Sequence, residues 1–97
     1  MPRPLFHALV LRDRHCRYPG CDRPPTWCQA HHVHHWRHGG PTSLDNTVLL
    51  CDRHHHLIHQ PGWHTTMHPD ATYTITTPTG TTHTSHPPGR LHLTLTG

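Results

Sequence analysis

Histidine and cysteine dominate the part of this chain between residues 16 and 59. The chain has 97 residues, of which 16 are histidines and four are cysteines. Imidazole and thiolate groups bind zinc and other transition metals, and histidine is also the usual general base near neutral pH. The spacing of these residues along the chain separates them into two candidate metal sites.

The first candidate site contains three cysteines and one histidine. Two close pairs provide them, Cys16 with Cys21 and Cys51 with His54. Two such pairs suit a closed tetrahedral zinc site, and a small domain gains much stability from a bound ion. We therefore predict structural zinc here, the alternative being three buried cysteines and a surface histidine. Cys28 could replace one ligand, but we expect it to pack as a free buried thiol.

The second candidate site is built on a predicted helix. His55 and His59 are four residues apart, so they share one helix face and can bind one ion. His54 lies about 100° away around the helix and points elsewhere. Either His31 or His32 completes the site from a strand, where neighbouring side chains point to opposite sides. One of that pair can then bind the metal while the other acts on water. The alternative is a histidine-rich surface with incidental metal affinity.

The elements that must position these residues can be read from local patterns. We expect a short helix over 5–14, strands over 27–33 and 47–50, and a helix over 53–59 with Asp52 as its N-cap. The order is therefore strand, long polar loop, strand and helix. Together with the N-terminal helix, it predicts a small α+β domain.

The composition changes after residue 60, where threonine becomes frequent. Alternating residues around Pro69-Asp70 predict a hairpin packed on the core, and the chain from residue 77 onward is expected to be loop or tail. We accordingly divide the chain into a metal-binding unit over 1–64 and a Thr/Pro-rich hairpin and tail over 65–97.

Charge and hydropathy limit the classes of protein to consider. Only 31% of the residues are hydrophobic, too few for a large core, and the net charge is +3 with neutral histidines. All basic residues are arginines, and most lie before residue 60, which suits a phosphate-rich partner. No segment reads as a signal peptide or a membrane span. We therefore expect a cytoplasmic protein in which the cysteines bind metal rather than form disulfides.

The order of the motif residues resembles the HNH endonucleases. The pattern consists of His31-His32, Gly39-Gly40, Asn46, Cys51, His54-His55 and His59. Residues 5–64 look more closely like the HNH domain found at the C-terminus of many actinobacterial proteins, which usually carry a long helical N-terminal region. Four residues rather than two separate the first two cysteines, and the second pair ends in histidine rather than cysteine. The resemblance implies a zinc-stabilised ββα-metal (His-Me finger) core.

The resemblance also implies roles for individual residues. His32 would be the general base that activates water, while His31, His55 and His59 would hold one divalent cation, which could be Mg²⁺, Mn²⁺, Ni²⁺ or Zn²⁺. Asn46 would fix the loop between the strands and so orient His32. The implied activity is metal-dependent hydrolysis of DNA phosphodiester bonds.

Three arginines are candidate contacts to DNA phosphates: Arg37, Arg53 and Arg23. Each could equally be a solvated surface charge. The main alternative function is a zinc-stabilised nucleic-acid-binding module without catalysis, and a histidine-rich metal buffer is a third interpretation. A homodimer, or a longer helical N-terminal region outside this chain, would be a further partner.

Overall fold

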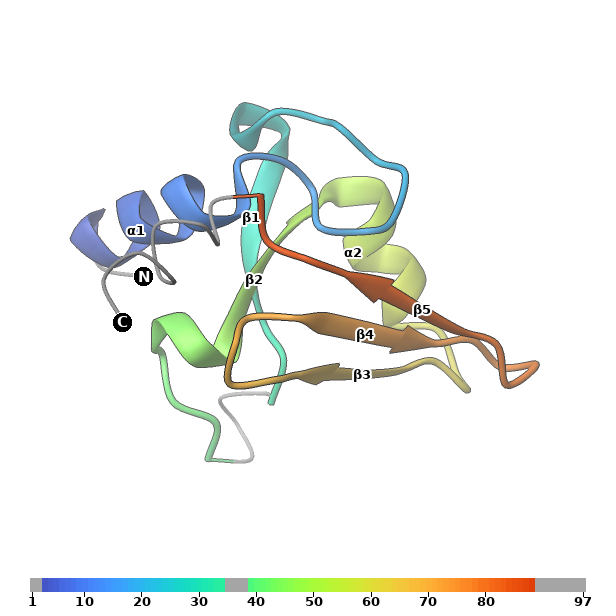
Figure 1. The fold of residues 1–97 in the computed structure, drawn as a ribbon. Helices are drawn as coiled ribbons and strands as arrows, with labels where there is room; N and C mark the ends of the chain where they lie inside the picture. Colours follow the sequence, from blue (N-terminus) through green and yellow to red (C-terminus); the bar gives the residue numbers. More distant parts are fainter. Residues whose placement is uncertain (1–2, 35–38, 89–97) are drawn as a thin grey trace.

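The computed structural model describes residues 3–34 and 39–88. Within these ranges it contains two α-helices and two antiparallel sheets, an α+β fold as expected from the sequence (Figure 1). The elements run in the order α1 (Arg3–Asp13), β1 (Cys28–His32), β2 (Thr47–Cys51), α2 (Asp52–Ile58), β3 (His64–Met67), β4 (Tyr73–Thr76) and β5 (Thr82–Ser85). Short 3-10 turns, Pro25–Trp27 and Leu44–Asn46, precede β1 and β2.

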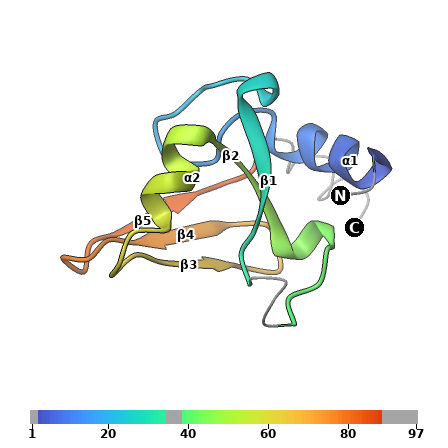
Figure 2. The same cartoon turned by 180° about the vertical axis from the view of Figure 1, so that it is seen from behind.

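The first sheet is an antiparallel pair of β1 and β2 that leads directly into α2. Its register pairs Cys28 with Cys51 and His32 with Thr47. All five residues of β2 are buried, as its apolar and β-branched sequence favours. The helix α2 begins at the residue after β2 and lies beside the strand pair (Figure 2). The two predicted strands and the helix after them are thus present, and residues 35–38 of the predicted loop lie outside the described residues.

The ends of both helices differ from the expected positions. α1 spans Arg3–Asp13 and so begins two residues early. Asp52 is the first residue of α2 rather than its N-cap, which is Cys51 in an extended conformation (φ −69°, ψ 164°). The extended backbone of β2 therefore continues to the cap itself. As a first-turn acid, Asp52 still interacts favourably with the helix dipole.

The second sheet has three strands, in the order β3-β4-β5. The expected hairpin of β3 and β4 is present, but the expectation of loop or tail after residue 77 was wrong, because β5 pairs with β4 (Figure 1). A turn closed by Gly80 N–H donating to Thr77 O (2.9 Å) returns the chain, and Gly80 supplies the positive φ of 91°. Threonines then face each other across the strands, a favourable β-sheet pairing.

Both sheets contribute to one hydrophobic core. Tyr73 and Ile75 of β4 are fully buried in a cluster with residues of β2 and α2. Residues on both sides of the division between 1–64 and 65–97 therefore share that cluster. Its buried members are Cys16, Val48, Leu50, Cys51, Ile58, Tyr73 and Ile75.

A buried ionic network joins the end of α1 to both sheets. The fully buried carboxylate of Asp13 accepts hydrogen bonds from Arg12 Nε (2.6 Å), Arg17 Nη1 (2.7 Å) and the Leu49 backbone N–H (2.9 Å). Arg17 also donates to the backbone oxygen of Ser85 (2.9 Å). Burial lowers the pKa of Arg17, and the charge of Asp13 opposes that shift. Arg17, in the loop between α1 and β1, thus links the end of α1 to the segment that ends β5.

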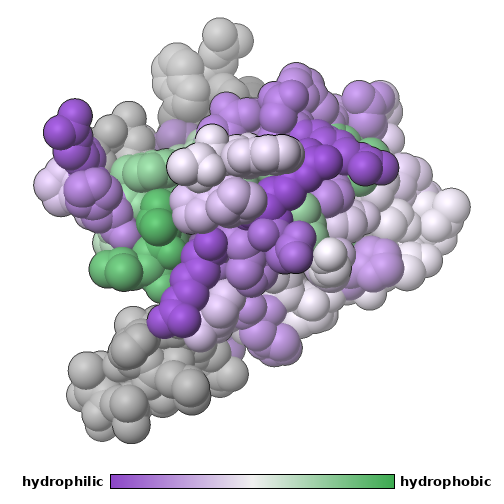
Figure 3. Space-filling view, turned by 90° about the horizontal axis from the view of Figure 1, so that it is seen from above, coloured by the Kyte–Doolittle hydropathy of each residue, from purple (hydrophilic) through white to green (hydrophobic). Residues whose placement is uncertain are grey.

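The surface around α1 is the most apolar part of one face of the molecule. Seen from above, hydrophobic surface gathers on the side where α1 lies, and most of the remaining face is polar (Figure 3). Leu11 of α1 is 70% exposed. Among the described residues, no helix has the length and apolar character needed to cross a membrane.

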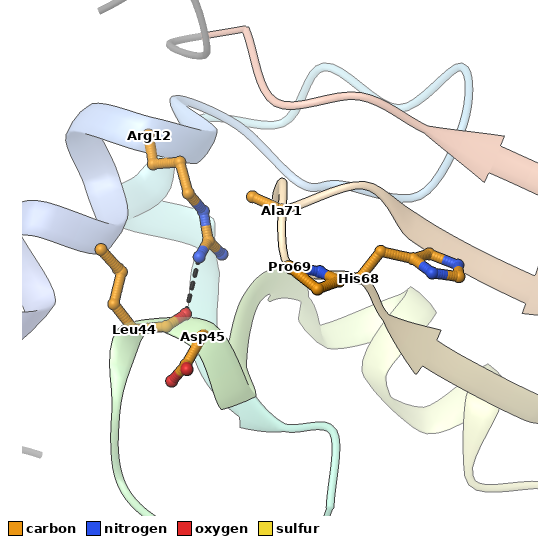
Figure 4. Close-up of a pocket in the computed structure, with 6 residues that line it drawn as sticks. All are labelled: Arg12, Leu44, Asp45, His68, Pro69 and Ala71. Atoms are coloured by element: carbon orange, nitrogen blue, oxygen red, sulfur yellow. Dashed lines mark hydrogen bonds between the residues drawn. The ribbon is translucent and has the colours of Figure 1, made fainter. Parts of the chain in front are cut away.

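A pocket of about 190 Å³ lies between α1, the turn before β2 and the turn after β3 (Figure 4). Arg12 lines this pocket, and its guanidinium group donates to Leu44 O (2.6 Å) and Thr47 O (2.7 Å) as well as to Asp13. Because these bonds occupy that group, we regard the pocket as part of the packing between elements.

Candidate metal centres

The structure brings the three cysteines and the histidine of the first candidate site together. The ligand atoms of Cys16, Cys21, Cys51 and His54 all lie within 4.8 Å of one another. His54 Nδ1 is 3.5 Å from Cys16 Sγ and 3.3 Å from Cys51 Sγ. Three thiols and one imidazole form a donor set suited to tetrahedral zinc. The group is therefore positioned to hold a metal ion and is compatible with structural zinc.

The loop after α1 folds into a tight knuckle around this group. Cys16 N–H donates to Arg23 O (3.0 Å), and Cys21 N–H donates to Tyr18 O (2.9 Å). Gly20 has a φ of 85°, which glycine adopts without steric cost. The Tyr18 ring stacks on His54, with centroids 4.1 Å apart. The four-residue spacing between the cysteines is thus accommodated by a hydrogen-bonded turn.

The thiols of this group differ in their acidity. Burial raises the pKa of Cys16 well above its ordinary value. Burial also acts on Cys51, but hydrogen bonds from the His54 backbone and from the Cys16 and Cys21 side chains outweigh it, so the pKa of Cys51 is lowered. Burial, followed by the charges of Arg53 and Arg23, lowers the pKa of His54. This shift favours the neutral imidazole, which is the form that binds metal.

Cys28 is not a member of this group. Its half-buried thiol donates to Pro24 O (3.3 Å) and Arg23 O (3.6 Å), and burial raises its pKa to about 11. All four cysteines are free thiols. Cys28 thus packs as a free thiol outside the cysteine group, as expected, but it is half-buried rather than buried.

The second group consists of three histidines from two elements. His31 of β1, His55 of α2 and His59, which caps α2, place their ligand nitrogens within 4.8 Å of one another. The three rings meet edge to face with centroids 4.7 to 5.3 Å apart. His55 Nε2 and His59 Nε2 are separated by 3.2 Å. Three convergent imidazoles can hold one transition-metal ion and leave further coordination positions for water or a phosphate oxygen.

One neighbour of this group, Gln29, was not predicted from the sequence. Its Nε2 lies 2.8 Å from His55 Nδ1. Gln29 is two residues before His31 on β1, so both side chains lie on the same side of the strand. That spacing is the signal that could have identified it. Burial lowers the pKa of His55, and the nearby His59 and His56 add to the shift.

His32 does not belong to the three-histidine group. Its Nε2 lies 2.9 Å from Thr42 Oγ1, a contact that the sequence did not suggest. Asn46 holds the intervening loop: its Nδ2 donates to His34 O (3.0 Å) and Pro41 O (2.8 Å), and its Oδ1 accepts from His34 N–H (2.9 Å). The adjacent histidines of β1 therefore have different surroundings.

The three arginines considered as phosphate contacts also differ. Arg53 lies exposed on α2. Arg23 Nη1 lies 3.7 Å from Cys51 Sγ, and its guanidinium lies 5.6 Å from the centre of the Trp27 ring. The structure thus places Arg23 beside the cysteine group. Arg37 and the rest of segment 35–38 are outside the described residues.

Comparison with known proteins finds relatives in mycobacteria. The chain is 40% identical over 90 residues to "Uncharacterized protein Rv3776" of Mycobacterium tuberculosis, an alignment that covers 92% of this chain and 17% of that protein. Over 88 residues it is 40% identical to "Uncharacterized protein Rv2100" of the same species, covering 90% of the chain and 16% of the relative. Over 57 residues it is 35% identical to "Uncharacterized protein Mb1179c" of Mycobacterium bovis, covering 59% and 12%. The chain thus spans a small part of the length of these relatives.

No family model and no solved structure matches this chain.

Proposed function

We propose that this chain is a metal-dependent HNH endonuclease domain that hydrolyses DNA phosphodiester bonds. The observation that carries the proposal is the convergence of His31, His55 and His59, with His32 adjacent in sequence but outside the group. Such a site separates metal binding from proton transfer. A closed Cys/His group beside it, built on the same helix, supplies the structural zinc of the proposed ββα-metal core.

The three imidazoles are the proposed ligands of the catalytic ion. Imidazole suits Zn²⁺ and Ni²⁺ better than the hard cation Mg²⁺. When bound, the ion supplies Lewis-acid polarisation of the scissile phosphate and stabilises the departing oxygen. The protein contributes geometry, because α2 and β1 fix the directions from which the imidazoles approach.

His32 is the proposed general base. If its Nε2–H donates to Thr42 Oγ1, the lone pair on Nδ1 is left to accept a proton from the attacking water. Asn46 supports this arrangement by bonding both His34 and Pro41, which holds the chain on both sides of segment 35–38. The exposed Arg53 is a proposed phosphate contact.

Nicking of supercoiled plasmid DNA tests the proposal. Zinc-loaded protein is incubated with added Ni²⁺, Mn²⁺ or Mg²⁺, and we expect nicking by the wild type with Ni²⁺. The His32→Ala variant should lose about 10²- to 10⁴-fold in rate, which is the usual contribution of a general base. His83→Ala, which removes an exposed histidine of β5, should nick like the wild type.

The rival function is a zinc-stabilised DNA-binding module without catalysis. It would replace the nuclease if the wild type retained zinc and bound DNA in a salt-sensitive manner, yet nicked with none of the ions. Equal nicking by His32→Ala and wild type would remove His32 as the base.

A further inference from the structure

A pocket of about 380 Å³ opens directly beside the three-histidine group. His31 and His59 belong both to that group and to the pocket lining, and His32 lines it as well. The opposite side comes from the start of the second sheet, where Trp63 and His64 line it. Any molecule held by the candidate metal centre therefore has this pocket next to it.

Trp63 forms part of the pocket wall and lies at the turn between α2 and β3. A tight turn leads from α2 into β3. Gly62 has a φ of 89° there, and the backbone N–H of Trp63 donates to the backbone oxygen of Gln60 (3.4 Å). A Cβ at Gly62 would lie only 3.0 Å from Pro78 Cβ, so this turn packs closely against the segment after β4. Trp63 is half-buried and packs against the hydrophobic core. One side of Trp63 thus contacts the hydrophobic core.

The chemistry of the lining suits one nucleotide. An indole face stacks on any nucleobase, and the exposed imidazole of His64 can donate a hydrogen bond to a phosphate or base oxygen. The pocket volume lies at the lower end of the range for small-molecule sites, which fits one base with its sugar. A base paired in duplex DNA would have to leave the stack to enter.

We infer that this pocket binds the base of one unpaired nucleotide next to the phosphate that is cut. The inference rests on the proposed nuclease function and names its substrate class as single-stranded or locally unpaired DNA. Trp63 stacks on the base, and His64 contacts the same nucleotide from the rim. The second sheet thereby takes part in substrate selection.

Fluorescence of Trp63 provides the first test. The double variant Trp27→Phe/Trp36→Phe leaves Trp63 as the sole tryptophan and retains every described residue that lines the pocket. The probe is a single-stranded thymidine hexanucleotide with phosphorothioate linkages, added to protein that holds its zinc. We expect the emission of Trp63 to be quenched in a saturable manner, and more weakly by a fully paired duplex. Absence of quenching by the single strand would overturn the inference.

Affinity measurements with the same hexanucleotide, now carrying a label, provide the second test. Trp63→Leu should weaken single-strand binding by roughly 5- to 150-fold, the range for loss of one stacked base. His64→Ala should weaken it in the same direction, whereas Trp27→Leu, at a ring 63% exposed and outside the pocket, should leave it unchanged. Equal binding by Trp63→Leu, His64→Ala and wild type would contradict the inference. Circular dichroism and the amount of bound zinc show whether each variant is folded. If Trp63→Leu is unfolded, the quenching of Trp63 fluorescence in the double variant decides whether the inference holds.

The two proposals can fail separately. Quenching and loss of affinity without any plasmid nicking would retain the nucleotide pocket and reject the nuclease. Nicking without quenching of Trp63 would retain the nuclease and reject the pocket.

Discussion

The imidazole of His55 has two nitrogens with different neighbours. Its Nε2 faces His59, and its Nδ1 lies 2.8 Å from the Gln29 amide. If Nε2 binds the ion, Nδ1 carries the proton. The side-chain oxygen of Gln29 would then face Nδ1 and accept a hydrogen bond from it. Metal-binding histidines usually donate their second N–H in this way, which fixes the ring and strengthens the ligand.

Replacing Gln29 should therefore weaken the three-histidine site. Gln29→Ala is expected to lower the affinity for Ni²⁺ by about 10- to 100-fold, as is typical for loss of such a partner. Gln29→Glu restores an acceptor and should recover most of the affinity. Calorimetric titration of zinc-loaded protein measures both, with Gln60→Ala at an exposed position as the control. Unchanged affinity in Gln29→Ala would show that the amide does not support the ligand.

Asp13 provides a second residue-scale prediction, on stability. Asp13→Asn keeps the shape but leaves the fully buried Arg17 without its counter-charge. Removing one partner of a buried ion pair costs about 3–5 kcal/mol. Urea unfolding should show a loss of that size, whereas Asp22→Asn, at an exposed carboxylate, should change stability by less than about 0.5 kcal/mol. Similar losses in both variants would contradict the importance of the buried network.

At the scale of elements, α2 and its cap contribute histidines to both candidate metal centres. His54 faces the cysteine group, while His55 and His59 face His31. The four-residue spacing and the 3.6-residue helical repeat account for this division, which is why the sequence predicted it. The helix has only seven residues, from Asp52 to Ile58, so we expect its stability to depend on these contacts.

Substitutions of neighbouring ligands on α2 and its cap should therefore differ in their effect on folding stability. Structural zinc contributes about 10–16 kcal/mol in small zinc domains, as much as or more than the roughly 5–15 kcal/mol of net stability typical of globular proteins. Cys51→Ser or chelation of the zinc should abolish the cooperative thermal transition seen by circular dichroism. His55→Ala should retain both the transition and one bound zinc. A chelated protein with an unchanged transition would contradict the structural role.

Local patterns predicted some elements and missed others. The β-branched and apolar run before Cys51 predicted β2, and the alternation on either side of Pro69-Asp70 predicted β3 and β4. The strand β5 was missed because the Pro, Gly and Thr residues of segment 77–85 read as a loop. Its pairing with β4 depends on the turn at Gly80 and on a strand partner, which a local pattern does not contain.

At the scale of the whole molecule, the second sheet completes both the core and the candidate site. Tyr73 and Ile75 fill the core, and Trp63 and His64 close the pocket beside His31. The sequence predicted the histidine and cysteine groups because their members are close in sequence or belong to one motif. It did not predict Arg17 bonding to Ser85, Thr42 meeting His32, or His64 lining the pocket. Those contacts arise from tertiary packing, and the Arg17–Ser85 pair spans 68 residues.

The most direct test of the central claim measures plasmid nicking and bound zinc on the same protein samples. The claim is that one chain uses a cysteine-rich centre for folding and a three-histidine centre for hydrolysis. We predict that wild type nicks DNA with added Ni²⁺, and that His32→Ala and His55→Ala keep one zinc but lose nicking. Nicking by both variants at the wild-type rate, or no nicking by folded, zinc-loaded wild type with any divalent ion, would contradict the account.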